Sequence, residues 1–252
     1  MPLSGVASEK SDMIYQSILS LSGEKKILAL LIDPEESSPE ELPLLVQSAG
    51  EAGVSMILVG GSLVSQPVAP LVRALKGLTT IPVMLFPGHP GQLCDEADGL
   101  LLLSLISGRN PEFLIGNHVN AARYLRRSTL EIIPVGYMLI ENKIVSSAEY
   151  ISNTRSIPSG KTDLAVSTAL AGEMLGLKMI YLEGGSGAPG IIPPELIAAV
   201  KQNIKIPLVV GGGIRNAVDL KRVYDAGADM AVIGNAIENN ASGLLEFAGV
   251  TE

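Results

Sequence analysis

The sequence predicts an α/β protein, a (β/α)8 barrel of the TIM type whose third helix is short or replaced by irregular chain. Apolar runs of strand length recur eight times along the 252 residues, and most are followed by a helical pattern. The runs are continuous rather than alternating, which is typical of parallel strands buried on both faces. A length of about 250 residues is usual for such a barrel. We therefore expect residues 1–252 to form one domain.

Each predicted strand ends at a glycine, a proline or a polar residue, as strands do where a turn follows. In chain order the strands are Ile27–Ile32, Met56–Val59, Val83–Phe86, Gly99–Leu103, Ile132–Val135, Met179–Leu182, Leu208–Val210 and Met230–Ile233.

Helical patterns lie between the strands, and several begin at a proline or a capping side chain. They cover Pro39–Ala52, Pro67–Lys76, Pro111–Arg127, Asp163–Leu177, Pro193–Gln202, Asn216–Ala226 and Ala236–Phe247. A further helix at Glu9–Leu21 is expected to cap the lower end of the barrel.

Two segments depart from the repeat. The chain after the third strand, FPGHPGQLCDEADG, is rich in turn residues, so the third helix is expected to be short or lost. Residues 137–161 form an insertion whose alternation around Asn142 and Lys143 predicts a small hairpin. A doubly wound open sheet is the alternative fold, and it fits less well because no G-x-G-x-x-G follows the first strand.

Composition excludes several classes of protein. No apolar run approaches the roughly 18 to 20 residues that span a bilayer, and the N-terminus does not resemble a secretory signal, so a cytoplasmic location is expected. One cysteine, Cys94, and two histidines cannot build a disulfide scaffold or a Cys/His zinc site. A net charge of −8 and a pI of about 4.9 argue against nucleic acid as a partner.

Residues that follow the strands are the candidates for chemistry, because barrels of this type bind ligands at the carboxyl ends of their strands. Glycine loops after the seventh and eighth strands, containing Gly212, Gly213 and Gly234, predict a phosphate site built from backbone N–H groups. Asn235 follows Gly234, and either helix capping or ligand contact fits its position.

Carboxylates follow two other strands. Glu183 ends the sixth strand beside the loop GGSG and shares a strand face with Tyr181, so it is placed to accept a proton from a hydroxyl of a phosphorylated ligand. Asp33 ends the first strand and Ser62 follows the second, a pair that would serve as a half-site for Mg²⁺ or, alternatively, as helix caps.

The segments LLIDPEE, ILVGGSLVS, MLFPGHPGQL, SLISGRNP, IPVGYMLIE, YLEGGSGAP, VVGGGIR and VIGN occur in this order. On these motifs the chain resembles the geranylgeranylglyceryl phosphate synthase family, from the first strand to the eighth. The resemblance implies a prenyltransferase that joins the primary hydroxyl of sn-glycerol 1-phosphate to a long all-trans prenyl diphosphate, most simply geranylgeranyl diphosphate, and releases diphosphate. Such a reaction belongs to ether lipid biosynthesis.

The resemblance also implies roles for particular residues. Asp33 and Ser62 match the family's Mg²⁺ site, Glu183 and Tyr181 its catalytic centre. The glycerol phosphate site corresponds to Tyr181, Leu182, Glu183, Gly184, Gly185, Ser186, Gly187, Gly212, Gly213, Gly234 and Asn235. Members tend to form dimers or hexamers, so a homo-oligomer is expected, and peripheral membrane contact for product release is compatible with the reaction. The turn-rich region around Phe86, Pro87, Leu105 and Ile106 is the expected wall for the prenyl chain.

Two departures from the family pattern bear on the donor. The first motif reads DPEES where many relatives have DPD followed by lysine, so one positive contact to diphosphate is absent. The chain has no tryptophan, and prenyl length is therefore not fixed by a tryptophan. The alternatives are a phosphate-binding isomerase or lyase, which would not need Mg²⁺, and a non-catalytic scaffold that binds glycerol phosphate.

Overall fold

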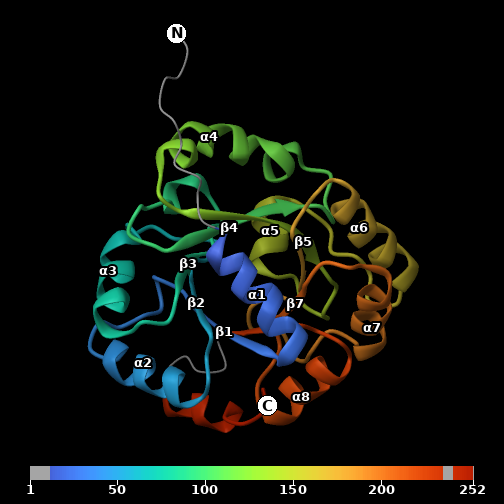
Figure 1. Ribbon diagram of the computed structural model, residues 1–252. Helices are drawn as coiled ribbons and strands as arrows, with labels where there is room; N and C mark the ends of the chain where they lie inside the picture. The colour runs from blue at the N-terminus through green and yellow to red at the C-terminus, as the bar shows by residue number, and fades with distance from the viewer. Residues whose placement is uncertain (1–11, 235–240, 252) are drawn as a thin grey trace.

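A closed parallel barrel forms the centre of the computed structural model, which describes residues 12–234 and 241–251 (Figure 1). Each strand pairs with the next, and β8 pairs with β1 to close the ring. The strands are β1 Ile27–Ile32, β2 Met56–Val59, β3 Val83–Leu85, β4 Gly99–Leu105, β5 Glu131–Leu139, β6 Met179–Glu183, β7 Leu208–Gly211 and β8 Met230–Ile233. All eight predicted strands are present, and the predicted fold class is confirmed.

Helices surround the barrel and follow most strands in turn (Figure 1). They are α2 Leu42–Glu51, α3 Ala69–Leu78, η2 Glu112–Gly116 leading into α4 Asn117–Arg127, α6 Thr162–Met174, α7 Pro194–Asn203, α8 Ala217–Asp225 and η4 Ala241–Phe247. After β3 the chain makes only the three-residue turn η1 Pro90–Gln92, as the turn-rich sequence predicts. The last predicted helix begins in residues outside the described part, and its described part, η4, is a 3-10 helix.

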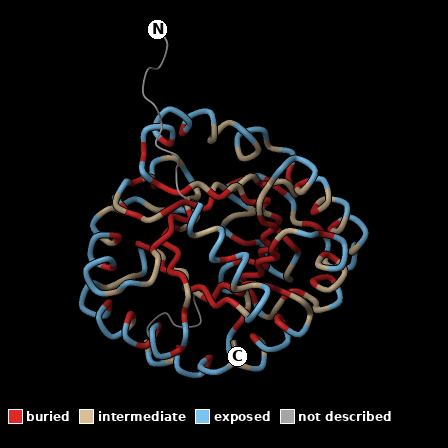
Figure 2. Tube along the Cα trace, in the orientation of Figure 1, coloured by how far each residue is buried: buried red, intermediate tan, exposed pale blue. Residues whose placement is uncertain are grey.

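Two layers of apolar side chains alternate across the strands. Side chains of one parity fill the barrel interior, and those of the other parity pack against the helices. Figure 2 shows the buried residues along the ring of strands and the exposed residues on the outer sides of the helices. Because both strand faces are covered, the strands read in the sequence as continuous apolar runs.

Helix α1, Met13–Glu24, lies across the end of the barrel where the strands begin (Figure 1). It was expected at Glu9–Leu21, and residues 9–11 lie outside the described part. The buried Glu131 accepts hydrogen bonds of 2.8 Å from the backbone N–H groups of Ile14 and Tyr15, so a carboxylate from β5 caps this helix.

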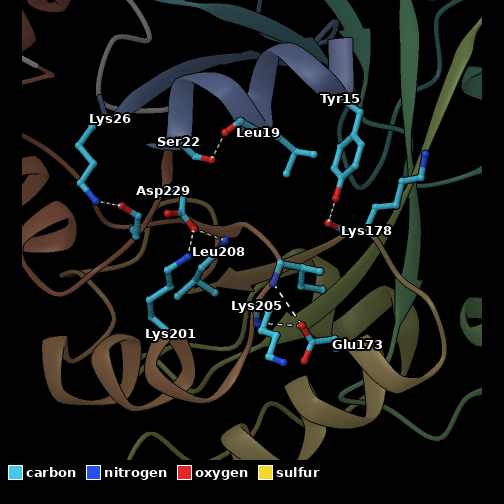
Figure 3. Close-up of polar contacts among 12 residues, drawn as sticks. Tyr15, Leu19, Ser22, Lys26, Glu173, Lys178, Lys201, Lys205, Leu208 and Asp229 are labelled. Carbon is cyan, nitrogen blue, oxygen red and sulfur yellow. Dashed lines mark hydrogen bonds and ion pairs between the residues drawn. The ribbon is translucent and has the colours of Figure 1, made fainter. Parts of the chain in front are cut away.

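Further polar contacts secure the same end of the barrel (Figure 3). The Tyr15 hydroxyl donates to the carbonyl of Lys178 at 3.0 Å. Asp229 accepts from the backbone N–H of Leu208 at 2.7 Å and from the ammonium of Lys201 at 2.6 Å.

Within the described residues, no helix combines the length and the apolar character needed to cross a membrane.

The insertion at residues 137–161 differs from the expected hairpin. β5 continues to Leu139, and a single antiparallel bridge joins Asn142 to Ile144. Lys143 between them has a φ of +63°, so the turn closes within three residues and leaves no room for two paired strands. The insertion then forms helix α5, Ser147–Ser152, which is not among the predicted helices.

Candidate active site

A cavity of about 670 Å³ opens at the end of the barrel where the strands finish. Its wall is built from loops that follow β1, β2, β3, β6, β7 and β8, together with residues of β4, β5, η2, α4 and α5. One part of the wall is apolar, and the other carries carboxylates and glycine loops. Because (β/α)8 barrels bind ligands at this end, the cavity is the candidate active site.

Glu183 ends β6 and lies buried against the cavity. The backbone N–H of Gly185 donates to its carboxylate at 2.6 Å, and the hydroxyls of Tyr137 and Tyr181 donate to it as well. Burial raises the pKa of Glu183 because it disfavours the charged form, and these hydrogen bonds oppose that effect only in part. A buried carboxylate with a raised pKa is suited to accept a proton from a bound hydroxyl.

Three aromatic rings lie beside this carboxylate. The ring centroids of Tyr137 and Tyr181 are 5.2 Å apart, and the ring of Phe86 lies 5.4 Å from Tyr181 and 5.9 Å from Tyr137. Tyr137 and Tyr181 are register partners on β5 and β6, which explains why both hydroxyls reach Glu183. Burial and the nearby Glu183 raise the pKa of both tyrosines, so they stay protonated donors.

The glycine loops after β6 and β7 interlock. Gly185, Gly187, Gly212 and Gly213 all have positive φ, between +69° and +97°, a conformation that favours glycine. A side chain at Gly212 would lie 2.7 Å from the backbone nitrogen of Gly185 and 2.8 Å from the Glu183 carboxylate. The close approach of the two loops therefore depends on glycine. Their backbones form one cradle of the kind that binds phosphate.

The other residues predicted for the phosphate site fall into three groups. Ser186 and Gly234 line the cavity with the glycine loops. The side chain of Leu182 packs in the outer apolar layer, and Gly184 is buried outside the cavity wall. Neither residue therefore lines the cavity. Asn235 lies outside the described residues.

Asp33 and Ser62 both line the cavity on its opposite side. Asp33 is half-buried, and one of its carboxylate oxygens accepts from the backbone N–H of Glu35 at 2.9 Å. Burial raises the pKa of Asp33, opposed by that hydrogen bond and supported by the charges of Glu36 and Glu35. The backbone at Gly61 packs against the carboxylate so closely that an added Cβ would lie 2.8 Å from the Asp33 Cγ.

This arrangement fits a cation that takes few ligands from the protein. The described residues contain no group of three or more His, Cys, Asp or Glu side chains arranged to hold a metal. One carboxylate and one hydroxyl suit Mg²⁺, which keeps waters and completes its shell from substrate phosphates. Asp33 and Ser62 therefore fit the predicted half-site.

Gln92 is a buried polar residue that no motif of the sequence marks. Its side-chain oxygen accepts from the backbone N–H groups of Gly88 at 3.2 Å and Gly61 at 3.5 Å, and its amide donates to the carbonyl of Gly61 at 2.9 Å. Gln92 comes from the short turn η1 that replaces the third helix. It thereby fixes the loop after β2, on which Ser62 lies, against the loop after β3.

The apolar part of the cavity extends along β4 toward α4. Its wall includes Leu100, Leu102, Leu103, Leu105, Phe113 and Ala121, with Phe86 and Pro87 at the β3 end. His118 of α4 also reaches it, with Nε2 3.0 Å from the hydroxyl of Ser104. Burial lowers the pKa of His118, which favours the neutral imidazole in this apolar setting.

Ile106 does not belong to this wall, which corrects one expectation. The cavity is lined by side chains from both faces of β4, Leu100 and Leu102 as well as Leu103 and Leu105, but not by Ile106. The Ile106 side chain packs in the outer layer, close to Gly136 and Gly172. Of the four residues expected to contact the prenyl chain, Phe86, Pro87 and Leu105 reach the cavity.

His89 and Cys94 also lie near this region. His89 lines the cavity, and its Nδ1 accepts from the backbone N–H of Gly91 at 3.0 Å, so it caps η1. Cys94 is buried, and burial raises the pKa of its thiol, which disfavours a reactive thiolate.

A parallel barrel with a glycine cradle and a buried carboxylate beside it belongs to the phosphate-binding (β/α)8-barrel enzymes. The apolar part of the cavity adds room for a substrate that has a hydrophobic chain as well as a phosphate. The chain belongs to the PcrB family, which it matches over residues 21–249.

Named relatives agree with the motifs. The chain is 48% identical over 216 residues to the geranylgeranylglyceryl phosphate synthase of Zunongwangia profunda, covering 85% of this chain and 92% of the relative. It is 44% identical over 230 residues to that of Flavobacterium johnsoniae, covering 90% and 95%. The family resemblance inferred from the sequence is confirmed.

Solved structures give the same result. The chain superposes on the (S)-3-O-geranylgeranylglyceryl phosphate synthase of Thermoplasma acidophilum, in complex with sn-glycerol-1-phosphate, with a TM-score of 0.86 and 30% identity, covering 93% of this chain and 97% of the other. An N-acetylmannosamine-6-phosphate 2-epimerase from Clostridium perfringens reaches a TM-score of 0.56 at 16% identity, a likeness of fold alone.

Proposed function

We propose that the protein is a geranylgeranylglyceryl phosphate synthase, a prenyltransferase of ether lipid biosynthesis. The primary hydroxyl of sn-glycerol 1-phosphate attacks C1 of a long prenyl diphosphate. An ether C–O bond forms, the bond between C1 and the diphosphate oxygen breaks, and diphosphate leaves. The names of the family relatives support this reaction, and so does the sn-glycerol-1-phosphate complex of the Thermoplasma acidophilum structure.

The observation that carries the proposal is the position of Glu183. Its carboxylate touches the glycine cradle through Gly185 and borders the cavity whose far part is apolar. A phosphate held in the cradle would bring its glycerol hydroxyls to the carboxylate, and Glu183 would take the proton of the attacking hydroxyl. Tyr137 and Tyr181 hold the carboxylate in place by donating to it.

The aromatic cluster of Phe86, Tyr137 and Tyr181 fits the second half of the reaction. An allylic C1 gains positive charge as its bond to diphosphate lengthens. Ring faces attract a cation within about 6 Å of their centroids. The three rings line the cavity beside Glu183, where a carbon under attack by the acceptor hydroxyl would lie.

Mg²⁺ would be held by Asp33 and Ser62, and when bound it would neutralise charge on the departing diphosphate. Gln92 and the backbone at Gly61 keep these two ligands in register across the loops after β1 and β2. The proposal of Mg²⁺ rests on this ligand set and on the family resemblance.

The donor chain would occupy the apolar part of the cavity along β4 and α4. The relatives' names favour a geranylgeranyl donor of 20 carbons. The homo-oligomeric state, the cytoplasmic location and the peripheral membrane contact stay predictions of the family resemblance.

The test is an incubation of purified protein with labelled sn-glycerol 1-phosphate, Mg²⁺ and prenyl diphosphates from C10 to C35, followed by extraction into organic solvent. sn-Glycerol 3-phosphate serves as a parallel acceptor, and Glu183→Gln as the matched inactive control. We expect a Mg²⁺-dependent ether lipid from the 1-phosphate alone, with the highest rate for the C20 donor. Binding of glycerol phosphate without product from any donor would refute the transferase and favour the scaffold.

A further inference from the structure

The cavity has an unbalanced set of charges for an enzyme whose substrates are anions. Asp33, Glu35, Glu36 and Glu183 all line it. Among the described residues of its wall, Arg215 is the only lysine or arginine. A phosphate monoester carries a charge of about −1.5 to −2 at pH 7, and backbone N–H groups supply only partial charges. The acceptor phosphate therefore calls for a cation close to the cradle.

Arg215 lies at the required place. It follows the Gly211–Gly213 loop of β7, and its guanidinium nitrogen Nη2 donates to the carbonyl of Ala188 at 2.9 Å and to that of Gly187 at 3.5 Å. Both carbonyls belong to the segment that continues the loop after β6. The side chain thus bridges the two loops that form the cradle while it lines the cavity.

The chemistry of arginine allows both contacts at once. A guanidinium carries five N–H donors in a planar fork, and the two hydrogen bonds described here use one nitrogen, Nη2. A lysine would keep the charge without the fork geometry. We propose that Arg215 binds the phosphate of the phosphorylated acceptor and positions the glycine cradle around it. This inference rests on the proposed function for the identity of the acceptor, and on the charges of the cavity for the need of a cation.

The experiment measures binding rather than turnover. Isothermal titration calorimetry without Mg²⁺ would use two probes, sn-glycerol 1-phosphate and inorganic phosphate, on the wild type, Arg215→Gln and Arg215→Lys. Arg109→Gln is the matched control, because Arg109 is likewise exposed and donates to a backbone carbonyl of its own loop, that of Gly108 at 2.7 Å, outside the cavity wall.

We expect Arg215→Gln to weaken binding of both probes about ten- to hundredfold, as for loss of a charge-assisted hydrogen bond. Arg215→Lys should recover part of this affinity, and Arg109→Gln should bind as the wild type does. Binding by the wild type should also fall as the pH drops through the second ionisation of phosphate near 6, and Arg215→Gln should flatten that dependence. A role in loop positioning alone would not change the shape of the pH profile.

Three results would overturn the inference. The first is unchanged affinity in Arg215→Gln. The second is an equal loss in the lysine and glutamine variants with an unchanged pH profile, which would assign Arg215 to loop positioning alone. The third is a pH dependence of inorganic phosphate binding that is the same in Arg215→Gln as in the wild type. Failure of the proposed function is distinguishable, because it would appear in the transfer assay as absence of the ether lipid product, whereas binding of inorganic phosphate tests Arg215 by itself.

Discussion

Gly61→Ala should separate the activity of this protein from its stability. An added Cβ would lie 2.8 Å from the Asp33 Cγ and closer still to one carboxylate oxygen. Ordinary contact begins at 3.4 Å, so the carboxylate must retreat by about 0.6 Å or more. Misplacing a functional group by about 1 Å costs about 100-fold in rate, so we expect a fall of about 10- to 100-fold. The carboxylate stands at the end of a side chain that can rotate, and the free energy of unfolding should change by no more than about 1 kcal/mol.

The assay measures initial rates of prenyl transfer against Mg²⁺ concentration, with urea unfolding in parallel. Gly77→Ala is the matched control, because Gly77 lies in α3, and an added Cβ would have no atom within 4 Å apart from its chain neighbours and the backbone of its own helix. It should raise the free energy of unfolding by about 0.5 to 1 kcal/mol and leave the rate unchanged. For Gly61→Ala we expect a higher Mg²⁺ requirement and an unchanged KM for glycerol phosphate. A wild-type rate at every Mg²⁺ concentration, or a loss of activity matched by unfolding, would refute the reasoning.

Three further predictions follow from the structure. Burial raises the pKa of Glu183, so the folded state binds the proton of this carboxyl more tightly than the unfolded state does. The free energy of unfolding should therefore fall as the pH rises from the ordinary glutamate pKa of about 4.3 through the raised pKa of the folded state. Urea unfolding at several pH values should show a smaller slope in Glu183→Gln, with the part due to Asp33 remaining. The transfer rate of the wild type should rise over the same range, and a slope as large in the variant as in the wild type would contradict the assignment. Ala121→Phe should shift donor preference in a chain-length series toward shorter prenyl diphosphates and lower the stability by about 1 to 3 kcal/mol. Ile106→Val, in the outer layer, should leave the donor preference unchanged. Equal donor preferences in the two variants would show that the prenyl chain does not bind beside Ala121. Asp229→Ala should lower the free energy of unfolding by about 2 to 4 kcal/mol, because Leu208 loses its acceptor, while the rate per folded molecule stays constant; a changed KM would count against this separation.

The strands and the glycine cradle could be predicted from the sequence because local rules determine them. A strand covered on both faces must be apolar at every position, so eight runs mark eight strands. Gly212 and Gly213 have positive φ, a conformation that favours glycine, and the sequence shows them directly after an apolar run. Glu183 could be found in the same way, as a lone acid at a strand end.

The remaining site residues depend on contacts between distant segments. Gln92 looks like an ordinary turn residue in the sequence, and its role appears only when β2 and β3 bring Gly61 and Gly88 together. Tyr137 reaches Glu183 because β5 runs on to Leu139 and pairs in register with β6. A longer strand was hard to predict there, since Pro134 and Gly136 interrupt the apolar run.

The acidic residues at the two ends of the barrel have different roles: those at one end stabilise the fold, and those at the other end are placed to act on a substrate. At the end where the strands begin, Glu131 and Asp229 each accept two hydrogen bonds at 2.6 to 2.8 Å, at least one of them from a backbone N–H. Such carboxylates stabilise the fold by satisfying groups that would otherwise be buried unpaired. At the other end, burial raises the pKa of both Asp33 and Glu183, so the fold holds their charged forms at a cost. A bound cation beside Asp33 and a substrate hydroxyl at Glu183 would relieve that cost, which is why these two carboxylates, and not the other pair, are the ones expected to act on a substrate.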